Sequence, residues 1–203
     1  MSAADRPRIA PIPAAEWGDD EQRAIAGAFG QAAVESFRTG ERPCPNVITT
    51  LARHPTLSGA WLKFNNVLFR ELALEPRLRE LAILRVAERT GARYEWAQHV
   101  RLAQQLGVTD AEVDAAGDAN GTGAPHEWSP VEAAALDATD ELVADHVVSD
   151  ATYARLAAHL DERTIMELVF AIGAYTCLAM VFNSACIQLD DDLIGTGRPF
   201  PGK

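Results

Sequence analysis

Apolar residues recur along most of this chain at the three-to-four-residue spacing of amphipathic helices, and no stretch makes a convincing strand. The clearest pattern covers residues 75–107, where Thr90 and Gly91 interrupt the apolar spacing. Glycine commonly follows the last residue of a helix, so a second helix is expected to start near Ala92 and to stop at Gly107. The stretch therefore predicts two consecutive helices.

Start and stop signals for helices place the other elements. The β-branched residues in 46–51 favour a strand, but the sequence that continues to Pro55 favours a short helix. The remaining pattern predicts helices over residues 19–31, 57–70, 130–146, 152–160 and 162–186, and one that begins near residue 109. The other segments are predicted to be an extended arm (1–15), a glycine-rich loop (118–128) and an irregular tail. The whole pattern predicts an all-α fold of about eight helices.

Two of the helix starts carry a more specific signal. Thr109 precedes Glu112 by three residues, and Ser129 precedes Glu132 in the same way. In such a capping box each of the two side chains bonds the backbone N–H of the other residue, which satisfies two donors at the start of the helix. Both pairs therefore predict a helix N-terminus.

Length and composition narrow the class of protein. The 203 residues suit one domain with a sizeable core, and an apolar fraction of 48% favours packed helices over disorder. The formal net charge of -11, without a run of Lys and Arg, argues against nucleic acid as a partner. Three cysteines without a regular spacing, and a start without an apolar leader, predict a cytoplasmic protein. Residues 165–187 are long enough to cross a membrane, but they contain the polar residues Glu167 and Asn183. This segment is therefore expected to be a buried helix, and the protein is not expected to bind a membrane.

Three ionisable side chains in the two central helices are the best candidates for chemistry. Glu95 and His99 are four residues apart, so both project from one helical face and can act on one ligand. A histidine can take up or release a proton near neutral pH, which suits general acid–base catalysis. Glu80 is predicted to orient His99 or to relay its proton. The alternatives are structural: a hydrogen-bonded core histidine, a Glu80 paired with Arg77 or Arg85, and a Glu95 in an exposed ion pair.

Aromatic and polar residues near these three are predicted to bind the substrate. Tyr94 and Trp96 are close in sequence, and one of them is expected to line a pocket while the other lies in the core. Arg85 or Arg93 suits the binding of a substrate carboxylate through paired N–H groups. Asn183 either lines the pocket or satisfies a neighbouring carbonyl group.

The same residues also raise the question of a metal site. Glu95 and His99 have the spacing of metal ligands, and His54 or His126 could complete a set. However, no H-x-x-x-H or H-E-x-x-H motif occurs, and the other histidines are isolated. No metal is therefore expected.

The string RELAILRVAERTGARYEWAQHVRLAQQLGV resembles the carboxymuconolactone decarboxylase family, which also includes the alkylhydroperoxidase D-like proteins. The flanking segments PNVITTLARHP and ELVFAIGAY agree with it. The resemblance covers residues 43–190, between an N-terminal arm and helix (1–42) and an irregular tail (191–203). It implies an all-α, alkylhydroperoxidase D-like helical bundle that assembles as a homo-oligomer (a dimer, trimer or hexamer), with its sites near subunit contacts.

The chain departs from the peroxidase members of this family in one respect. Those members carry a glutamate, a C-x-x-C pair, and a histidine that is separated from the second cysteine by three residues. Laid onto this sequence, the glutamate and the histidine fall on Glu80 and His99, whereas the two cysteines fall on Ala92 and Glu95. A thiol peroxidase needs a thiolate nucleophile and a resolving thiol, and neither alanine nor glutamate supplies one. The resemblance therefore disfavours thiol peroxidase activity.

Without the cysteine pair, the sequence resembles the decarboxylase members of the family. It implies an acid–base lyase, a decarboxylase or isomerase, that needs no cofactor and acts on a small carboxylated or lactone substrate. Two alternatives stay open. One is a non-catalytic oligomeric member that binds a small ligand. The other is a peroxidase-like member that uses other residues such as Cys177 and Cys186, which are nine residues apart.

Overall fold

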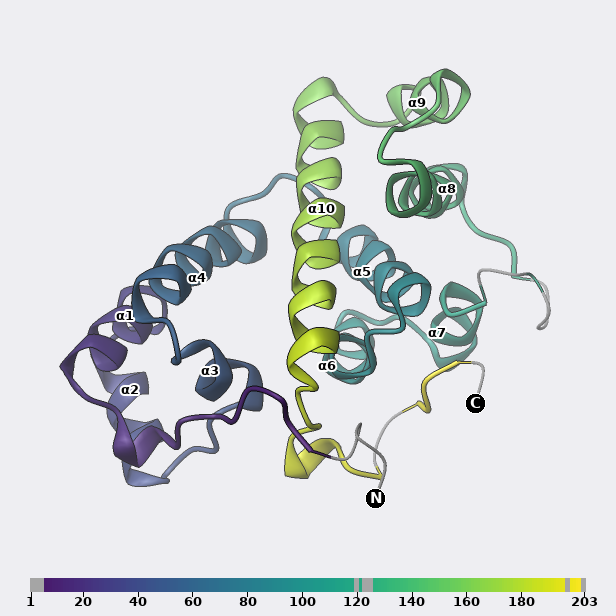
Figure 1. The fold of residues 1–203 in the computed structure, drawn as a ribbon. Coiled ribbons are helices and arrows are strands. Elements are labelled where there is room, and N and C mark those ends of the chain that lie inside the picture. The colour runs from purple at the N-terminus through teal and green to yellow at the C-terminus, as the bar shows by residue number, and fades with distance from the viewer. Residues whose placement is uncertain (1–5, 119–120, 122–125, 196–197, 202–203) are drawn as a thin grey trace. The chain divides into compact units, whose positions relative to one another are not determined.

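The computed structural model describes residues 6–118, 121, 126–195 and 198–201, and within these residues it contains helices and no strand (Figure 1). The all-α prediction is therefore confirmed. The predicted loop 118–128, arm and tail lie partly outside the described residues. The α-helices are α1 (Asp19–Phe29), α2 (Gln31–Thr39), α3 (Asn46–Leu51), α4 (Pro55–Arg70), α5 (Pro76–Thr90), α6 (Arg93–Gln105), α7 (Asp110–Ala116), α8 (Pro130–Asp145), α9 (Asp150–Ala157) and α10 (Glu162–Ala185), with two 3-10 turns, η2 (Ala14–Glu16) and η3 (Asp191–Leu193).

The chain forms two compact units. The first comprises Met1–Glu71 with Ser184–Asp191, and the second comprises Leu72–Asn183 with Asp192–Lys203. The domain limits predicted from the sequence stay a prediction.

In the first unit α1 packs against α2 and α4. One helix had been expected over residues 19–31, but Gly30 adopts φ +84° and separates α1 from a second helix, α2. The break adds one helix to the prediction; the described residues form ten α-helices, against the predicted number of about eight. The short helix preferred over a strand for residues 46–51 is present as α3. The core of this unit consists of Ala14, Trp17, Ile25, Val34, Phe37, Ile48, Ala52 and Leu62.

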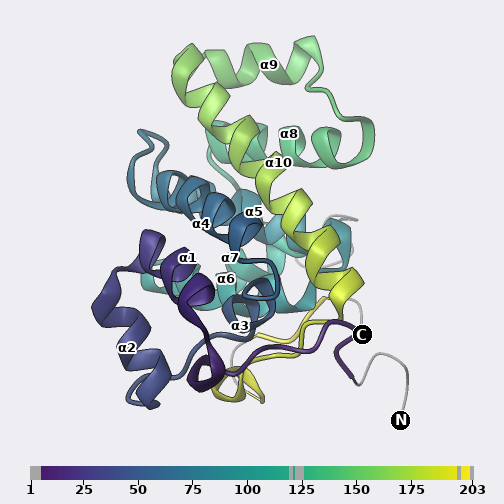
Figure 2. The ribbon, with the colours of Figure 1, turned by 60° about the vertical axis from the view of Figure 1, so that its left-hand side comes forward.

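The second unit is organised around α5, which contacts α6, α7 and α8. Every residue from Leu78 to Ala87 is buried, including Arg79, Glu80 and Arg85. A helix that is buried all round belongs to the centre of a protein, and its charged side chains need partners there. The surrounding core consists of Leu81, Leu84, Ala87, Ala92, Trp96, Val100, Ala103, Val108, Val113, Ala116, Leu136 and Ala179. In two views α8 and α9 lie near the N-terminal end of α10 (Figure 1, Figure 2).

The helix ends of the second unit follow the local signals closely. Gly91 (φ +68°) ends α5 and Gly107 (φ +85°) follows α6, as predicted. Both capping boxes are present, at the starts of α7 and α8. Arg77 at the start of α5 also binds both capping glutamates, with Nη2 2.6 Å from Glu112 Oε1 and Nε 2.9 Å from Glu132 Oε1. One guanidinium group therefore ties together the first turns of three helices.

Candidate active site

Glu80 of α5 and His99 of α6 meet inside the second unit. His99 Nδ1 lies 2.6 Å from Glu80 Oε2, and the side chains are 7% and 0% exposed. Arg79 donates to the other carboxylate oxygen, Oε1, through Nε at 3.1 Å and Nη2 at 3.0 Å. The sequence had suggested Arg77 or Arg85 as a partner of Glu80. That suggestion is wrong: the arginine that binds Glu80 is Arg79.

The charge of this group follows from its partners. Burial acts to raise the pKa of Glu80, but His99 and Arg79 outweigh burial, so that the pKa of the carboxyl group is lowered from its ordinary value. Glu80 is therefore ionised at neutral pH and can only accept hydrogen bonds. Because Nδ1 of His99 must then be the donor, any proton that the ring exchanges with a ligand is exchanged at Nε2.

Glu95 lies in the first turn of α6 and is 1% exposed. Neither of its carboxyl oxygens has a hydrogen-bond partner. Burial raises the pKa of Glu95 well above its ordinary value, so the group is a neutral carboxylic acid at neutral pH. The exposed ion pair considered for Glu95 is therefore wrong. The helical spacing brings it onto the same face as His99, but the hydrogen-bond partner of His99 is Glu80.

Two aromatic residues of α10 pack against rings of α6, and one of them contacts His99. The ring of Tyr175 meets that of His99 edge-on, with centroids 4.8 Å apart, and Phe182 meets Tyr94 at 5.4 Å. Gln98 Nε2 donates to Tyr94 Oη at 3.0 Å. Sequence reasoning missed Tyr175 and Phe182, because their place in an apolar helix does not distinguish them from other core residues.

The other predicted binding residues have structural contacts. Trp96 lies in the core, with Nε1 3.3 Å from the Arg198 carbonyl oxygen. Arg85 is buried and donates to Asp140 at 3.2 Å. Asn183 Nδ2 donates to the Thr90 carbonyl oxygen at 2.8 Å, which is the structural alternative proposed for it. Of the pair Tyr94 and Trp96, Trp96 lies in the core, and Tyr94 is buried against Phe182 of α10.

The residues considered for a metal site have other contacts. His54 caps α4, where its Nδ1 accepts a hydrogen bond from the Leu57 N–H at 3.2 Å. His126 stacks edge-on against Trp128, 4.3 Å between ring centroids. No group of three His, Cys, Asp or Glu side chains in the described part of the chain is arranged to hold a metal ion.

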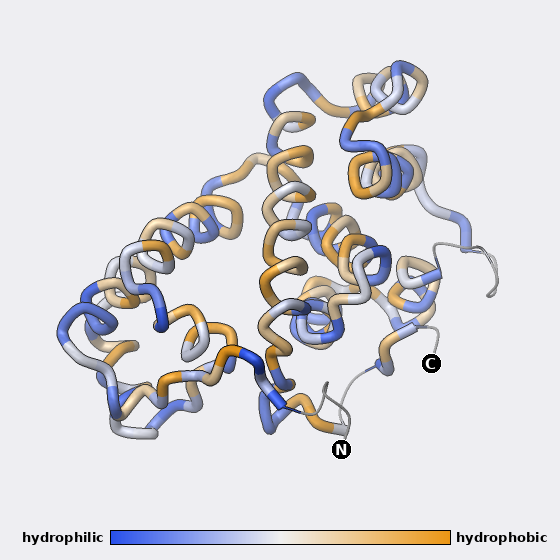
Figure 3. Tube along the Cα trace, viewed as in Figure 1, coloured by the Kyte–Doolittle hydropathy of each residue, from blue (hydrophilic) through white to orange (hydrophobic). Residues whose placement is uncertain are grey.

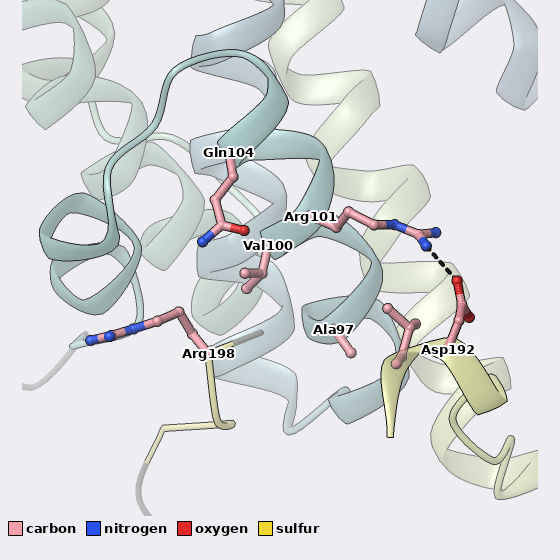
Figure 4. A pocket seen from close by; sticks show the side chains of 7 residues that line it. Ala97, Val100, Arg101, Gln104, Asp192 and Arg198 are labelled. Carbon is pink, nitrogen blue, oxygen red and sulfur yellow. Dashed lines mark hydrogen bonds and ion pairs between the residues drawn. The ribbon is translucent and has the colours of Figure 1, made fainter. Parts of the chain in front are cut away.

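A small cavity of about 180 Å³ lies on another face of α6 (Figure 4). Ala97, Arg101 and Gln104 of α6 line it, together with residues of the C-terminal segment, and Arg101 is bound to Asp192 at 2.8 Å. Residues 97 and 101 follow 95 and 99 by two positions, about 200° around a helix, so this face differs from that of Glu95 and His99. Ligand pockets usually measure about 300–1,000 Å³. The cavity is therefore small for a substrate.

Comparison with known proteins agrees with this fold. An uncharacterized peroxidase-related protein from Silicibacter sp. TM1040 is 18% identical and has a TM-score of 0.75 over 98% of this chain and 100% of that chain. The alkylhydroperoxidase AhpD core protein from Ralstonia eutropha JMP134 is 18% identical and has a TM-score of 0.75 over 95% and 97%. A variant of the debrominase Bmp8 in complex with 2,3,4-tribromopyrrole is 17% identical and has a TM-score of 0.67 over 92% and 94%. At these identities the likeness shows the fold alone.

The sequence comparison matches part of the chain to a family model. No curated protein matches the chain. Residues 55–141, which include Glu80, Glu95 and His99, match the model described as the carboxymuconolactone decarboxylase family. The family match thus covers less than half of the chain, and the structural neighbours show an alkylhydroperoxidase D-like fold.

Proposed function

We propose that the protein is a cofactor-free acid–base enzyme, a decarboxylase or isomerase that acts on a small carboxylated or lactone substrate. The observation that carries this proposal is the buried pair of Glu80 and His99, joined at 2.6 Å. An ionised carboxylate that holds one ring nitrogen as an N–H donor leaves the opposite nitrogen as the base. The family match over residues 55–141 supports the same reaction class.

In this proposal His99 moves the proton and Glu80 is a positioning residue. When Nε2 takes up a proton, the imidazolium ion is stabilised by the Glu80 carboxylate at Nδ1. Arg79 keeps that carboxylate oriented through its two N–H groups. In a decarboxylation the bond from carbon to the carboxylate breaks, CO₂ leaves, and the electron pair remains as an enolate or carbanion. The imidazolium ion, whose Nε2 proton comes from solvent or from the substrate's carboxyl group before CO₂ leaves, then delivers that proton to the carbon.

Glu95 has a different role in the proposed reaction. A neutral carboxylic acid can donate a hydrogen bond to a carbonyl oxygen, and that bond strengthens as negative charge develops there. Being neutral, it also does not repel a carboxylated substrate. We assign Glu95 as the donor to the enolate oxygen and Tyr94 as a wall of the site. Arg85 is bound to Asp140, so we leave it out of the proposed machinery.

Two alternatives make different predictions. A thiol peroxidase of this fold would need a reactive cysteine such as Cys177 or Cys186, and alkylation of these thiols would then abolish peroxide turnover. Cys44 is unsuited to that role, because burial and the nearby Asp190 raise its pKa to about 12. A non-catalytic, ligand-binding member would bind a small molecule and leave it unchanged.

The test is a turnover assay with a panel of carboxylated lactones and small aromatic acids, with product and CO₂ release measured. We expect one class of compound to be consumed, and expect His99→Gln to lower kcat by 10²–10⁴-fold, the usual contribution of a general acid or base. The exposed Tyr153 of α9 offers a control, since Tyr153→Phe should leave kcat unchanged. Binding without turnover would favour the non-catalytic alternative, and turnover that survives His99→Gln would exclude His99 as the base.

A further inference from the structure

The last described residues of the chain, Arg198, Pro199, Phe200 and Pro201, pack against α6 and α7, and we call them the strap (Figure 1). This short segment contains both hydrophilic and hydrophobic residues (Figure 3). The end of a chain is usually poorly ordered unless specific contacts tie it down. Three of the four strap residues make such contacts.

The apolar contact of the strap is with Trp96, in the first turn of α6. The ring of Phe200 meets that of Trp96 edge-on, with centroids 5.9 Å apart. The guanidinium group of Arg93, three residues earlier on the same helix, lies 5.9 Å from the centre of the Phe200 ring. The indole Nε1 of Trp96 donates to the Arg198 carbonyl oxygen at 3.3 Å. Trp96 is 1% exposed, so the strap supplies the acceptor that a buried indole N–H needs.

The polar contact of the strap is with α7. Arg198 donates to both carboxylate oxygens of Asp114, with Nε 2.8 Å from Oδ1. Pro201 lies over Gly117, the residue that follows α7: a Cβ atom added there would come within 2.6 Å of Pro201 Cγ and within 2.6 Å of the Trp96 ring. Because a larger residue would clash with both, the glycine allows Pro201 and Trp96 to pack closely against the backbone. The strap therefore fits a specific place on the surface of the second unit.

The first turn of α6 has weaker local support than the starts of neighbouring helices. α7 and α8 begin with capping boxes, and the Ser149 side chain caps α9. The N-cap residue of α6 is Ala92, whose methyl group cannot accept a backbone N–H, and alanine is among the poorest N-cap residues. The turn therefore depends on tertiary contacts, and the strap supplies them to Arg93 and Trp96.

We propose that the strap positions Glu95, by fixing the turn of α6 between Arg93 and Trp96 in which this side chain lies. The inference rests on the proposed function, in which Glu95 donates a hydrogen bond to the enolate oxygen. Neither carboxyl oxygen of Glu95 has a hydrogen-bond partner within the described residues. The place of the carboxyl group is therefore set by the helix turn that carries it. Such a donor must be held in place, since a misplacement of about 1 Å can cost about 10²-fold in rate.

The strap should act on Glu95 and leave His99 in place. His99 lies one turn further along α6, where the Glu80 carboxylate of α5 and the Tyr175 ring of α10 contact it. The contacts of the strap are instead with the first turn of α6 and with α7. Loss of the strap should therefore weaken the donor without removing the base.

Native-state hydrogen exchange of the full chain, followed by NMR, tests the physical part of the proposal without a substrate. Phe200→Ala removes the ring that contacts Trp96. The protection of the Trp96 amide, which bonds the Ala92 carbonyl oxygen at 2.9 Å, should fall roughly tenfold or more, while that of Ala103 near the other end of α6 stays unchanged. Phe200→Tyr keeps the ring and should behave like wild type. Ile194→Ala changes an exposed apolar residue of the same C-terminal segment and is the matched control.

Kinetics test the functional part, with the compound of the panel that is consumed. Phe200→Ala should lower kcat about tenfold with little change in KM, because a donor to the enolate oxygen acts on charge that develops in the transition state. In a Glu95→Leu background the same substitution should have no further effect, since the donor that the strap positions is already absent. Arg198→Gln weakens the strap at Asp114 and should show the same pattern to a smaller degree.

Three results would overturn the proposal. Unchanged exchange at Trp96 in Phe200→Ala would mean that the strap does not hold the turn. A loss of protection without a loss of kcat, or a loss of kcat that is equally large in the Glu95→Leu background, would mean that the strap does not act through Glu95. If no compound is consumed, the proposed function fails, and the carboxyl ¹³C signal of Glu95 at neutral pH decides about the strap. A signal that moves toward the position of an ionised carboxylate in Phe200→Ala supports the positioning role, and an unchanged signal overturns it.

Discussion

Replacement of Glu95 by glutamine should make the protein more stable relative to wild type as the pH rises. The carboxyl group of Glu95 is 1% exposed and neither oxygen has a partner, and burial raises its pKa well above the ordinary value. An unfolded glutamate ionises near pH 4.3. Below that pH both states are protonated. Above it the unfolded state loses its proton while the folded state keeps it, so ionisation favours unfolding.

The magnitude follows from linkage. Between the unfolded and the folded pKa of Glu95, wild type loses about 1.4 kcal/mol of unfolding free energy for each pH unit relative to a variant that cannot ionise. Glutamine is neutral throughout, so the difference between Glu95→Gln and wild type should be smallest near pH 4 and should grow toward pH 7. Any constant cost of burying the amide shifts the whole curve without changing its slope.

The assay is urea denaturation followed by circular dichroism at half-unit intervals from pH 4 to pH 8. Glu95→Leu is a matched variant, because it removes the same ionisation with a different side chain and should show the same slope. A difference that does not change with pH would refute the reasoning. It would mean that Glu95 ionises in the folded protein as it does in the unfolded chain.

Three further predictions follow from other parts of the structure. Glu80→Gln removes the carboxylate that pairs with Arg79 in the core and should cost about 3–5 kcal/mol at neutral pH, measured by urea denaturation. The pKa of Glu80 is lowered in the folded protein, so the stability that its carboxylate contributes is lost as the pH falls and the group becomes protonated. The difference in unfolding free energy between Glu80→Gln and wild type should therefore diminish over that pH range. A difference that stays constant there would contradict the prediction. Arg77→Ala breaks two ion pairs that are mostly buried, and it should lower the free energy of unfolding, measured by urea denaturation, by about 1–2 kcal/mol. Arg155→Ala breaks an exposed ion pair and should lower that free energy by less than about 1 kcal/mol. Equal losses in the two variants would contradict the prediction. Cys44 has a pKa of about 12, so little of it is thiolate at pH 8, and it should react with iodoacetamide on the order of 10³-fold more slowly than a free cysteine. The reaction is followed by mass spectrometry. A rate equal to that of a free cysteine would contradict the prediction.

Features set by neighbouring residues could be predicted from the sequence. Gly91 and Gly107 stand where a helix must end in a left-handed conformation, and both have positive φ values. The capping boxes depend on residues three apart, so Thr109 and Ser129 could be assigned directly. The predicted helix ended at residue 31, so α2 (Gln31–Thr39), which starts directly after Gly30, was not predicted.

The candidate site was predicted in part. Glu80, Glu95 and His99 were recognised from their positions in the central motif, but their pairing depends on how α5 and α6 pack. The arginines at 77, 79 and 85 are indistinguishable in the sequence, and only the tertiary structure directs Arg79 to Glu80 and Arg85 to Asp140. Burial likewise decides that Glu95 is neutral, which no local pattern could indicate.

The central claim is that Glu80 holds His99 in the form that presents Nε2 as the base. The most direct measurement is the ¹⁵N NMR spectrum of the His99 ring, with the exposed His146 of the same protein as an internal reference. We predict a proton on Nδ1 in the neutral ring, loss of that preference in Glu80→Gln, and a shift of the Nε2 signal when a carboxylated lactone or aromatic acid binds. A ring that carries its proton on Nε2 in wild type, and that responds neither to Glu80→Gln nor to any such compound, would contradict the account.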